Sequence, residues 1–176
     1  ADRKFDLQPV SNDTNVVQYA IEMIQAGSAD ALMRGNTQTR DFLMPVLNRV
    51  NHLIRPDRLL THIVMIKIPT YHKMLAISDV TLLVNPSIEE RKKVIVNMVD
   101  ALHVFGVKQP NIGLLSLIEK PAFHMKDTVE AQTILIDHQD EPIANCNLVG
   151  PITWDLMLNK EAARLKGYDN PACGEF

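Results

Sequence analysis

Hydrophobic and polar positions along the chain follow two different periods, which predict helices alternating with short strands. Apolar residues recur at helical spacing over about 14–26, 39–50, 88–105, 128–139 and 154–166. Short apolar or alternating runs at 4–10, 29–33, 59–68, 73–78, 111–118 and 143–149 predict strands, and 81–84 fits either a short strand or an extended loop. Helices that alternate with strands in this way predict an α/β fold with a largely parallel sheet.

Local signals mark where several of these elements begin and end. Ser87 is followed three positions later by Glu90, a capping box that begins a helix at Ile88, and Gly106 ends that helix. The other predicted ends are Asn12 or Asp13 and Gly27 for the first helix, Asp127 for the start of 128–139 and Gly167 for the end of 154–166. The short connection at residues 69–72 predicts that 59–68 and 73–78 form an antiparallel hairpin.

The ends of the predicted strands carry the candidate binding residues, because open α/β sheets bind ligands beyond the carboxyl ends of their strands. Run 29–33 stops at Arg34 and Gly35 before a helix that starts near Thr39. Glycine permits a tight turn there, and the first N–H groups of the helix are free to bind an anion. A plain loop with a solvated arginine is the alternative. The candidates are Arg34, Gly35, Asn36 and Thr37; Ser78 and Asp79; Ser116 and Glu119; and Gly150, Pro151 and Asp155.

Some of these residues have structural interpretations that the sequence leaves open. Ser78 and Asp79 also fit a turn-forming pair. Asp155 fits a cap or first-turn position of helix 154–166, which we favour over a role in binding. Glu119 precedes no helix, so we expect its carboxylate to meet a cation or to lie open to a cleft. Trp154 fits either the core or the wall of a cleft.

Composition excludes several classes of partner. The chain has 176 residues, of which 46% are hydrophobic and 22% charged, as in an ordinary globular protein. A net charge of -3 gives no reason to expect nucleic acid or a membrane as partner. The two cysteines have no paired spacing, which fits a reducing compartment, so we expect a cytoplasmic location. Neither the cysteines nor the histidines have the spacing of metal ligands, so we expect no metal. The nucleotide and hydrolase motifs Gly-x-Gly-x-x-Gly, Walker A and Gly-x-Ser-x-Gly are also missing.

Residues 27–35, Gly-Ser-Ala-Asp-Ala-Leu-Met-Arg-Gly, resemble the Gly-x-Ala-Asp-x-Leu-Met-Lys-Gly strand of the phosphate acetyl/butyryltransferases. Further matches follow in the family's order and span nearly the whole chain. They are Thr61-His62, Ser78-Asp79-Val80 with Asn85-Pro86, residues 114–119, residues 150–155, Lys166-Gly167 and residues 170–174. The butyryl branch fits better than the acetyl branch.

The resemblance implies a three-layer αβα fold with a mostly parallel sheet and two subdomains that flank a cleft, similar to isocitrate and isopropylmalate dehydrogenases. We expect residues 1–110 to belong to the first subdomain and 111–176 to the second. A single doubly wound domain is the alternative.

The resemblance also implies an acyltransferase that moves a butyryl or acetyl group between coenzyme A and phosphate. Its substrates would be acyl-coenzyme A and phosphate or acyl phosphate, with no tightly bound cofactor, and we expect a homo-oligomer. Arg34, Asn36 and Thr37 suit the phosphate, while Ser116, Glu119 and the Gly150-Pro151 turn suit the opposite wall of the cleft. The alternative is a non-catalytic module that binds coenzyme A or acyl phosphate, or assembles with a partner.

The chain departs from the family pattern at several positions. Val149 precedes Gly150-Pro151 where the family usually has aspartate, Arg34 replaces a lysine, and Met44 stands where the acetyl branch tends to carry an arginine. Family members are longer, and the Ser-Arg and Asp residues associated with their chemistry lie beyond the point that corresponds to Phe176. We therefore expect a central portion of such an enzyme and assign no catalytic residue.

Overall fold

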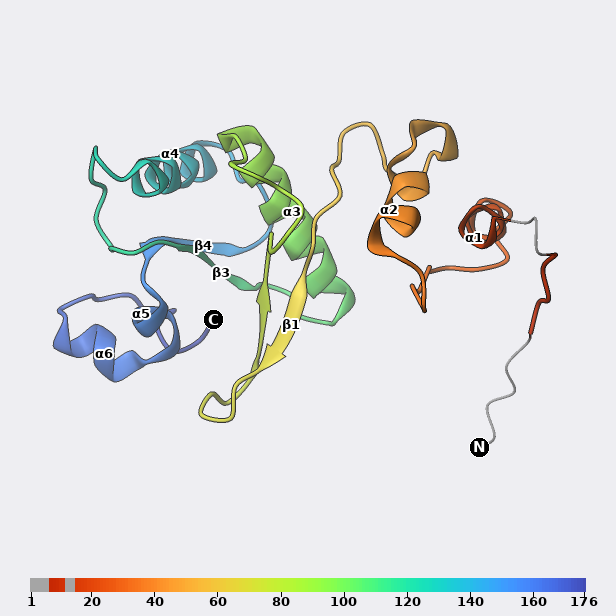
Figure 1. Cartoon of the computed structure of the whole chain (residues 1–176). Helices are drawn as coiled ribbons and strands as arrows, with labels where there is room; N and C mark the ends of the chain where they lie inside the picture. The colour runs from red at the N-terminus through yellow and green to blue at the C-terminus, as the bar shows by residue number, and fades with distance from the viewer. Residues whose placement is uncertain (1–6, 12–14) are drawn as a thin grey trace. The chain divides into compact units, whose positions relative to one another are not determined.

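The computed structural model describes residues 7–11 and 15–176. Contacts divide the chain into two compact units, Ala1–Leu60 and Thr61–Phe176 (Figure 1). The division into subdomains expected near Pro110 stays a prediction.

The described part of the first unit is helical. It contains α1 (Val16–Gln25), α2 (Thr39–Leu47) and a 3-10 turn, η1 (Arg49–Asn51). Asn15 caps α1 by accepting hydrogen bonds from the N–H groups of Val17 and Gln18, whereas the predicted caps at residues 12 and 13 lie outside the described residues. The buried Asn51 donates to the Pro45 carbonyl at 2.8 Å and joins α1 to α2 through Gln18.

Two predictions in this unit are wrong. Residues 29–33 form no strand: Met33 is 96% exposed, and the described part of the unit offers no second strand to pair with. An apolar run without a partner leaves its ladder hydrogen bonds unmade, so composition alone does not create a strand. Helix α2 ends at Leu47 rather than 50, because Asn48 is extended and its side chain accepts from the N–H of Val50. The strand predicted at 4–10 lies partly outside the described residues, and 7–10 form no strand.

The second unit begins with the predicted hairpin. Strands β1 (Val64–Lys67) and β2 (Met74–Ile77) pair antiparallel, with Val64 opposite Ile77 and Lys67 opposite Met74. Both strands are shorter than predicted, because the ladder lasts only as long as both partners remain extended. Residues 81–84 form a loop.

The central helix and strand follow the sequence signals closely. Helix α3 (Ile88–Val104) begins with the predicted capping box between Ser87 and Glu90, and Gly106 follows it at φ 87°. Strand β3 spans Asn111–Leu115, and α4 spans Lys126–Asp140. Met125 is the N-cap of α4, so the prediction of Asp127 as its cap is wrong: Asp127 lies in the first turn.

The last elements differ from the predictions in their boundaries. Strand β4 (Asn147–Ile152) starts later than predicted, because the N–H of Cys146 bonds the Ala144 carbonyl in a turn, and it runs through Gly150 and Pro151 instead of stopping before them. The predicted helix 154–166 is two helices, α5 (Trp154–Leu158) and α6 (Lys160–Leu165). Asn159 is extended between them and caps α6 by accepting from Glu161 and Ala162.

Strands β3 and β4 form a parallel pair, whereas β1 and β2 form a separate antiparallel one, so a larger parallel sheet is not seen among the described residues. Adjacent residues of β4 face different apolar clusters. Leu148 packs with residues of α3 and α4, and Val149 packs with residues of α5 and the hairpin. Figure 1 shows α4 on one side of β3 and β4, and α5 and α6 on the other. The α/β class is confirmed.

Candidate functional site

The carboxyl ends of β3 and β4 bring polar side chains together, as expected for a parallel pair. Ser116 directly follows β3, and its N–H donates to the Ile152 carbonyl of β4 at 2.9 Å. The Ser116 hydroxyl donates a hydrogen bond to Oδ2 of Asp127 at the start of α4. Beside them, a cavity of about 430 Å³ is lined by Leu115, Ser116, Leu117, Asp127, Thr153 and Trp154.

A loop braced by Thr128 places Asp127 at this edge. The Thr128 side chain is fully buried. Its Oγ1 donates to the Met125 carbonyl at 2.7 Å and accepts from the N–H of Ala122 at 2.9 Å, which closes the loop before α4. Asp127 therefore rests on a fixed first turn and faces the end of β3.

Asp155 lies in the first turn of α5, the structural placement that we favoured from the sequence. Its carboxylate accepts from Oγ1 of Thr153 at 2.7 Å and lies 2.8 Å from Nζ of Lys166. The hydrogen bond from Lys166, and then that from Thr153, lowers the pKa of Asp155 below its ordinary value.

Glu119 is half-buried, and its negative charge contributes to the pKa of the same lysine, Lys166. The pKa of Lys166 is raised, first by its hydrogen bond to Asp155 and, among smaller causes, by the negative charge of Glu119. Glu119 therefore lies within electrostatic range of a cation, which agrees with one of the two surroundings expected for it.

Gly150 and Pro151 lie inside β4 rather than in a turn. A Cβ placed on Gly150 would come within 2.5 Å of Cβ of Leu114 and 3.1 Å of the Leu114 carbonyl oxygen. The glycine is thus required for the close approach of β3 to β4. Pro151 is fully buried, and the Gly150–Pro151 peptide is cis.

Ser78 and Asp79 follow the hairpin, and Asp79 holds the loop after it. Its Oδ1 accepts from the N–H of His62 at 2.6 Å, and its Oδ2 accepts from Leu82 at 2.8 Å and Leu83 at 2.7 Å. Burial raises the pKa of Asp79, but the three backbone donors outweigh burial and lower it overall. The turn-forming interpretation therefore describes its contacts. The buried Ser78 hydroxyl has no hydrogen-bond partner among the described residues.

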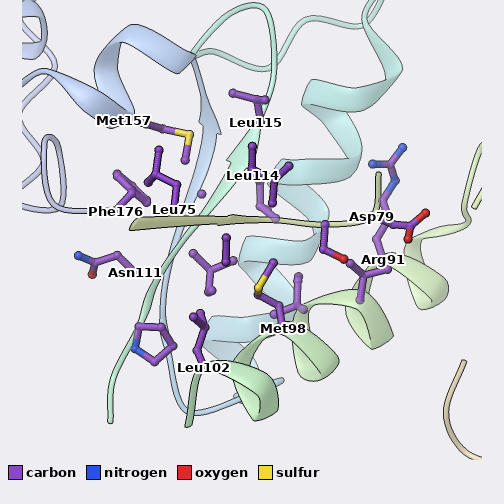
Figure 2. Close-up of a pocket in the computed structure, with 18 of the residues that line it drawn as sticks. Leu75, Asp79, Arg91, Met98, Leu102, Asn111, Leu114, Leu115, Met157 and Phe176 are labelled. Carbon is purple, nitrogen blue, oxygen red and sulfur yellow. The ribbon is translucent and has the colours of Figure 1, made fainter. Parts of the chain in front are cut away.

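A larger cavity of about 540 Å³ joins this region to the strand ends. Its walls come from β2, α3, β3 and the chain's last residues; Leu75 and Phe176 lie toward one end and Asp79 and Arg91 toward the other (Figure 2). Nε of Arg91 lies 3.3 Å from Oε2 of Glu130, an ion pair without hydrogen-bond geometry. The cavity is mostly apolar; Asp79 and Arg91 are polar groups at one end, and Asn111 is a polar group near Phe176 at the other (Figure 2).

Arg34, Gly35, Asn36 and Thr37 belong to the first unit, whereas every other candidate belongs to the second. Arg34 is exposed, and its Nη1 donates to the Thr37 carbonyl at 2.6 Å, so the guanidinium folds back over its own loop. The Thr37 N–H bonds the Gly35 carbonyl at 2.9 Å, which makes the loop a tight turn.

Sequence reasoning did not assign Asp127 or Arg91 to the site, and it left Trp154 undecided. Trp154 is 38% exposed and lines both cavities, so it is a wall residue. Its place directly after β4 was a signal that could have found it. The positions of Asp127 and Arg91 depend on where helices α4 and α3 pack, and the local sequence pattern does not specify that packing. The described residues contain no cluster that could hold a metal ion and no helix long and apolar enough to cross a membrane.

Comparison with known protein families shows which family this chain belongs to. The family model described as phosphate acetyl/butaryl transferase matches residues 6–175. This chain is a member of that family.

Individual relatives come from both branches of the phosphate acetyl/butaryl transferase family. The chain is 29% identical over 158 residues to a phosphate acetyltransferase of Thermotoga maritima, covering 90% of this chain and 53% of the relative. It is 27% identical over 169 residues to a phosphate butyryltransferase of Clostridium acetobutylicum, covering 94% and 56%. The two values are too close to separate the branches. The chain spans about half the length of these relatives.

A solved structure agrees with the family. A branched-chain phosphotransacylase from Enterococcus faecalis superimposes with a TM-score of 0.81 at 25% sequence identity, covering 91% of this chain and 56% of that one. The α/β arrangement described above is therefore shared with a solved phosphotransacylase.

Proposed function

We propose that this protein takes part in acyl transfer between coenzyme A and inorganic phosphate, in which the acyl group on phosphate is an acyl phosphate. The observation that carries the proposal is the family match over residues 6–175. In the reaction, a phosphate oxygen forms a bond to the thioester carbonyl carbon and the carbon–sulfur bond breaks. The sulfur leaves as a thiolate and takes up a proton, and the acyl phosphate is released.

The candidate residues supply groups that suit this chemistry. Arg34, Asn36 and Thr37 are proposed to bind phosphate, because a guanidinium and neighbouring donors match phosphoryl oxygens. Arg34 folds back over its loop through the Thr37 carbonyl, so phosphate binding is proposed to exchange this contact for charge-assisted ones.

The second unit is proposed to supply further substrate-binding groups of its own. Ser116 and the Gly150-Pro151 segment lie at or near the carboxyl edge of β3 and β4, where parallel sheets bind ligands. Glu119 and Asp155 are proposed to position Lys166 at this edge. Ser78 is proposed as a free hydroxyl donor, which Asp79 positions through the loop that it holds.

We further infer the three-layer αβα fold and two subdomains around a cleft. The opposite clusters contacted by Leu148 and Val149 of β4 support a sheet covered on both faces. We also propose that the protein forms a homo-oligomer in the cytoplasm. Coenzyme A is proposed as a substrate rather than a tightly bound cofactor.

Thiol release tests the proposal. Butyryl-coenzyme A is incubated with the purified protein in the presence and absence of phosphate, and free thiol is followed with a chromogenic disulfide. Both cysteines of the chain, Cys146 and Cys173, are buried, which keeps the protein's own thiol signal small. We expect release that depends on phosphate. Release at the same rate without phosphate would indicate hydrolysis, and binding without release would indicate a non-catalytic module; either result would contradict the proposal.

A further inference from the structure

A histidine and a threonine hydroxyl lie in hydrogen-bond contact beside the hairpin. Nδ1 of His62, which precedes β1, lies 2.8 Å from Oγ1 of Thr81 in the loop after β2. Thr81 is exposed, whereas His62 is half-buried. In the tautomer that carries its hydrogen on Nε2, the imidazole accepts a hydrogen bond from the threonine hydroxyl. This is the contact of a hydroxyl nucleophile with its general base, and the proposed function does not use it.

Asp79 holds both partners of this contact in place. Its Oδ1 accepts from the backbone N–H of His62 at 2.6 Å. Its Oδ2 accepts from the N–H of Leu82 at 2.8 Å and from that of Leu83 at 2.7 Å. One carboxylate therefore anchors the residue that bears the imidazole and the two residues that follow Thr81. A nucleophile and a base that the fold already positions lose little freedom when they react.

The charge of Asp79 also suits the transfer of a proton to His62. Burial raises the pKa of Asp79, the three backbone donors lower it, and attraction to His62 is a smaller lowering cause. The carboxylate and the imidazole are therefore within electrostatic range of each other. The negative charge stabilises the imidazolium that forms when His62 takes up the threonine proton. The three side chains thus combine a nucleophile, a base and an anionic support.

We propose that Thr81 is a site of self-acylation by acyl phosphates. Oγ1 of Thr81 forms a bond to the acyl carbonyl carbon, and the bond from that carbon to the bridging phosphate oxygen breaks. The hydroxyl proton passes to Nδ1 of His62, and phosphate leaves with the electron pair of the broken bond. The imidazolium then gives its proton to the phosphate or to water. The products are a threonine ester and inorganic phosphate, so no further reactant is needed.

Exposure and leaving-group chemistry select the acyl donor. Thr81 is exposed, so the donor reaches it from solvent. Phosphate leaves as a weaker base than a thiolate, so an acyl phosphate acylates a hydroxyl more readily than a coenzyme A thioester does. The inference goes beyond the proposed function, which makes acyl phosphate available as a product. Acyl phosphate added as a reagent serves equally well.

Mass spectrometry after incubation with butyryl phosphate tests the inference. The purified protein is incubated with this reagent without coenzyme A, and peptide mapping locates the labelled residues. Acyl phosphates also acylate exposed lysines directly. Hydroxylamine separates the two products, because it cleaves an ester and leaves an amide intact. We expect one hydroxylamine-sensitive butyryl group, on Thr81.

Four variants assign the reaction to the pair. Thr81→Ala should lose the ester, and Thr81→Ser should keep it because serine offers the same hydroxyl. His62→Gln should lower the rate of ester formation about 100-fold or more, a usual contribution of a general base, while its backbone N–H can still bond Asp79. Thr70→Ala is the matched control, because Thr70 is also exposed, in the connection between β1 and β2. The control should form the ester at the rate of the unaltered protein.

The outcomes separate this inference from the proposed function. Labelling of lysines alone, or an ester that forms at the same rate in His62→Gln, would overturn self-acylation. Phosphate-dependent thiol release from butyryl-coenzyme A is measured on the same variants, and we expect Thr81→Ala to keep it. Loss of release in Thr81→Ala would overturn self-acylation as a separate activity. An unaltered protein that forms the ester but releases no thiol would contradict acyl transfer and leave self-acylation standing.

Discussion

The Ser116 hydroxyl donates a hydrogen bond to the Asp127 carboxylate, and this bond ties the end of β3 to the first turn of α4. This contact fixes the polar side of the cavity between the two parallel strand ends. A charge-assisted hydrogen bond of this kind contributes about 1.5–3 kcal/mol.

The contact can be measured with a double-mutant cycle on Ser116→Ala and Asp127→Asn. Each single variant should lower the free energy of unfolding by about 1–2 kcal/mol, and the double variant should lose less than the sum. Urea titration at pH 7 gives the four values. Additive losses would mean that the two side chains do not interact in solution.

Gly150→Ala should destabilise the protein by about 1–3 kcal/mol, the cost of overpacking at a site without spare volume. The new methyl group would meet Cβ and the backbone of Leu114, so β3 and β4 would have to separate. Gly35→Ala is the control, because nothing lies within 4 Å of a Cβ at Gly35. Thermal and urea unfolding check both variants, and equal stability of the two would contradict the close approach.

Asp79 should make stability depend on acid pH. Its pKa is lowered in the folded state, so its contribution is present above the ordinary aspartate value of about 3.9 and is lost as pH falls through the folded value. Asp79→Asn should cost about 2–3 kcal/mol at pH 7 because it weakens three charge-assisted bonds, and the gap to the unaltered protein should shrink below about pH 4.

Urea unfolding between pH 7 and pH 3 measures the pH effect. Asp169→Asn, at an exposed position, is the control and should change stability by less than about 0.5 kcal/mol. A gap that stayed constant down to pH 3 would show that the charge of Asp79 does not carry the effect.

Arg34→Ala should weaken binding of phosphate or acyl phosphate by about 1.5–3 kcal/mol. Its melting temperature should barely move, because the exposed side chain contributes little packing. Arg40→Ala removes a neighbouring exposed arginine as a control for net charge. Calorimetry measures the affinity of each variant for inorganic phosphate. Equal phosphate affinity of the two variants would contradict the role of Arg34 and favour a plain loop with a solvated arginine.

Local chemistry explains which predictions succeeded. The capping box of Ser87 and Glu90, the glycine after α3 and the short hairpin connection are decided by neighbours in sequence, and all three were predicted correctly. The first-turn position of Asp155 belongs to the same class.

The failures depend on partners distant in sequence. Run 29–33 has strand-like composition, but the described part of its own unit contains no strand to pair with it. Strand β4 passes through Gly150 and Pro151, where Leu114 of β3 packs against the glycine. The contact between Ser116 and Asp127 likewise depends on how α4 packs on the sheet. The sequence pattern therefore identified the strand ends as candidate sites. It did not identify the residues that neighbouring helices place beside those ends.

Phosphorus NMR of a mixture of butyryl-coenzyme A, inorganic phosphate and the protein tests the central claim most directly. It follows phosphate into product and distinguishes transfer from hydrolysis of the thioester. The account predicts a new acyl phosphate signal that grows in step with free coenzyme A and disappears when excess coenzyme A drives the reaction back. Release of coenzyme A with butyrate as the only acyl product, or no change in the phosphate signal, would contradict it.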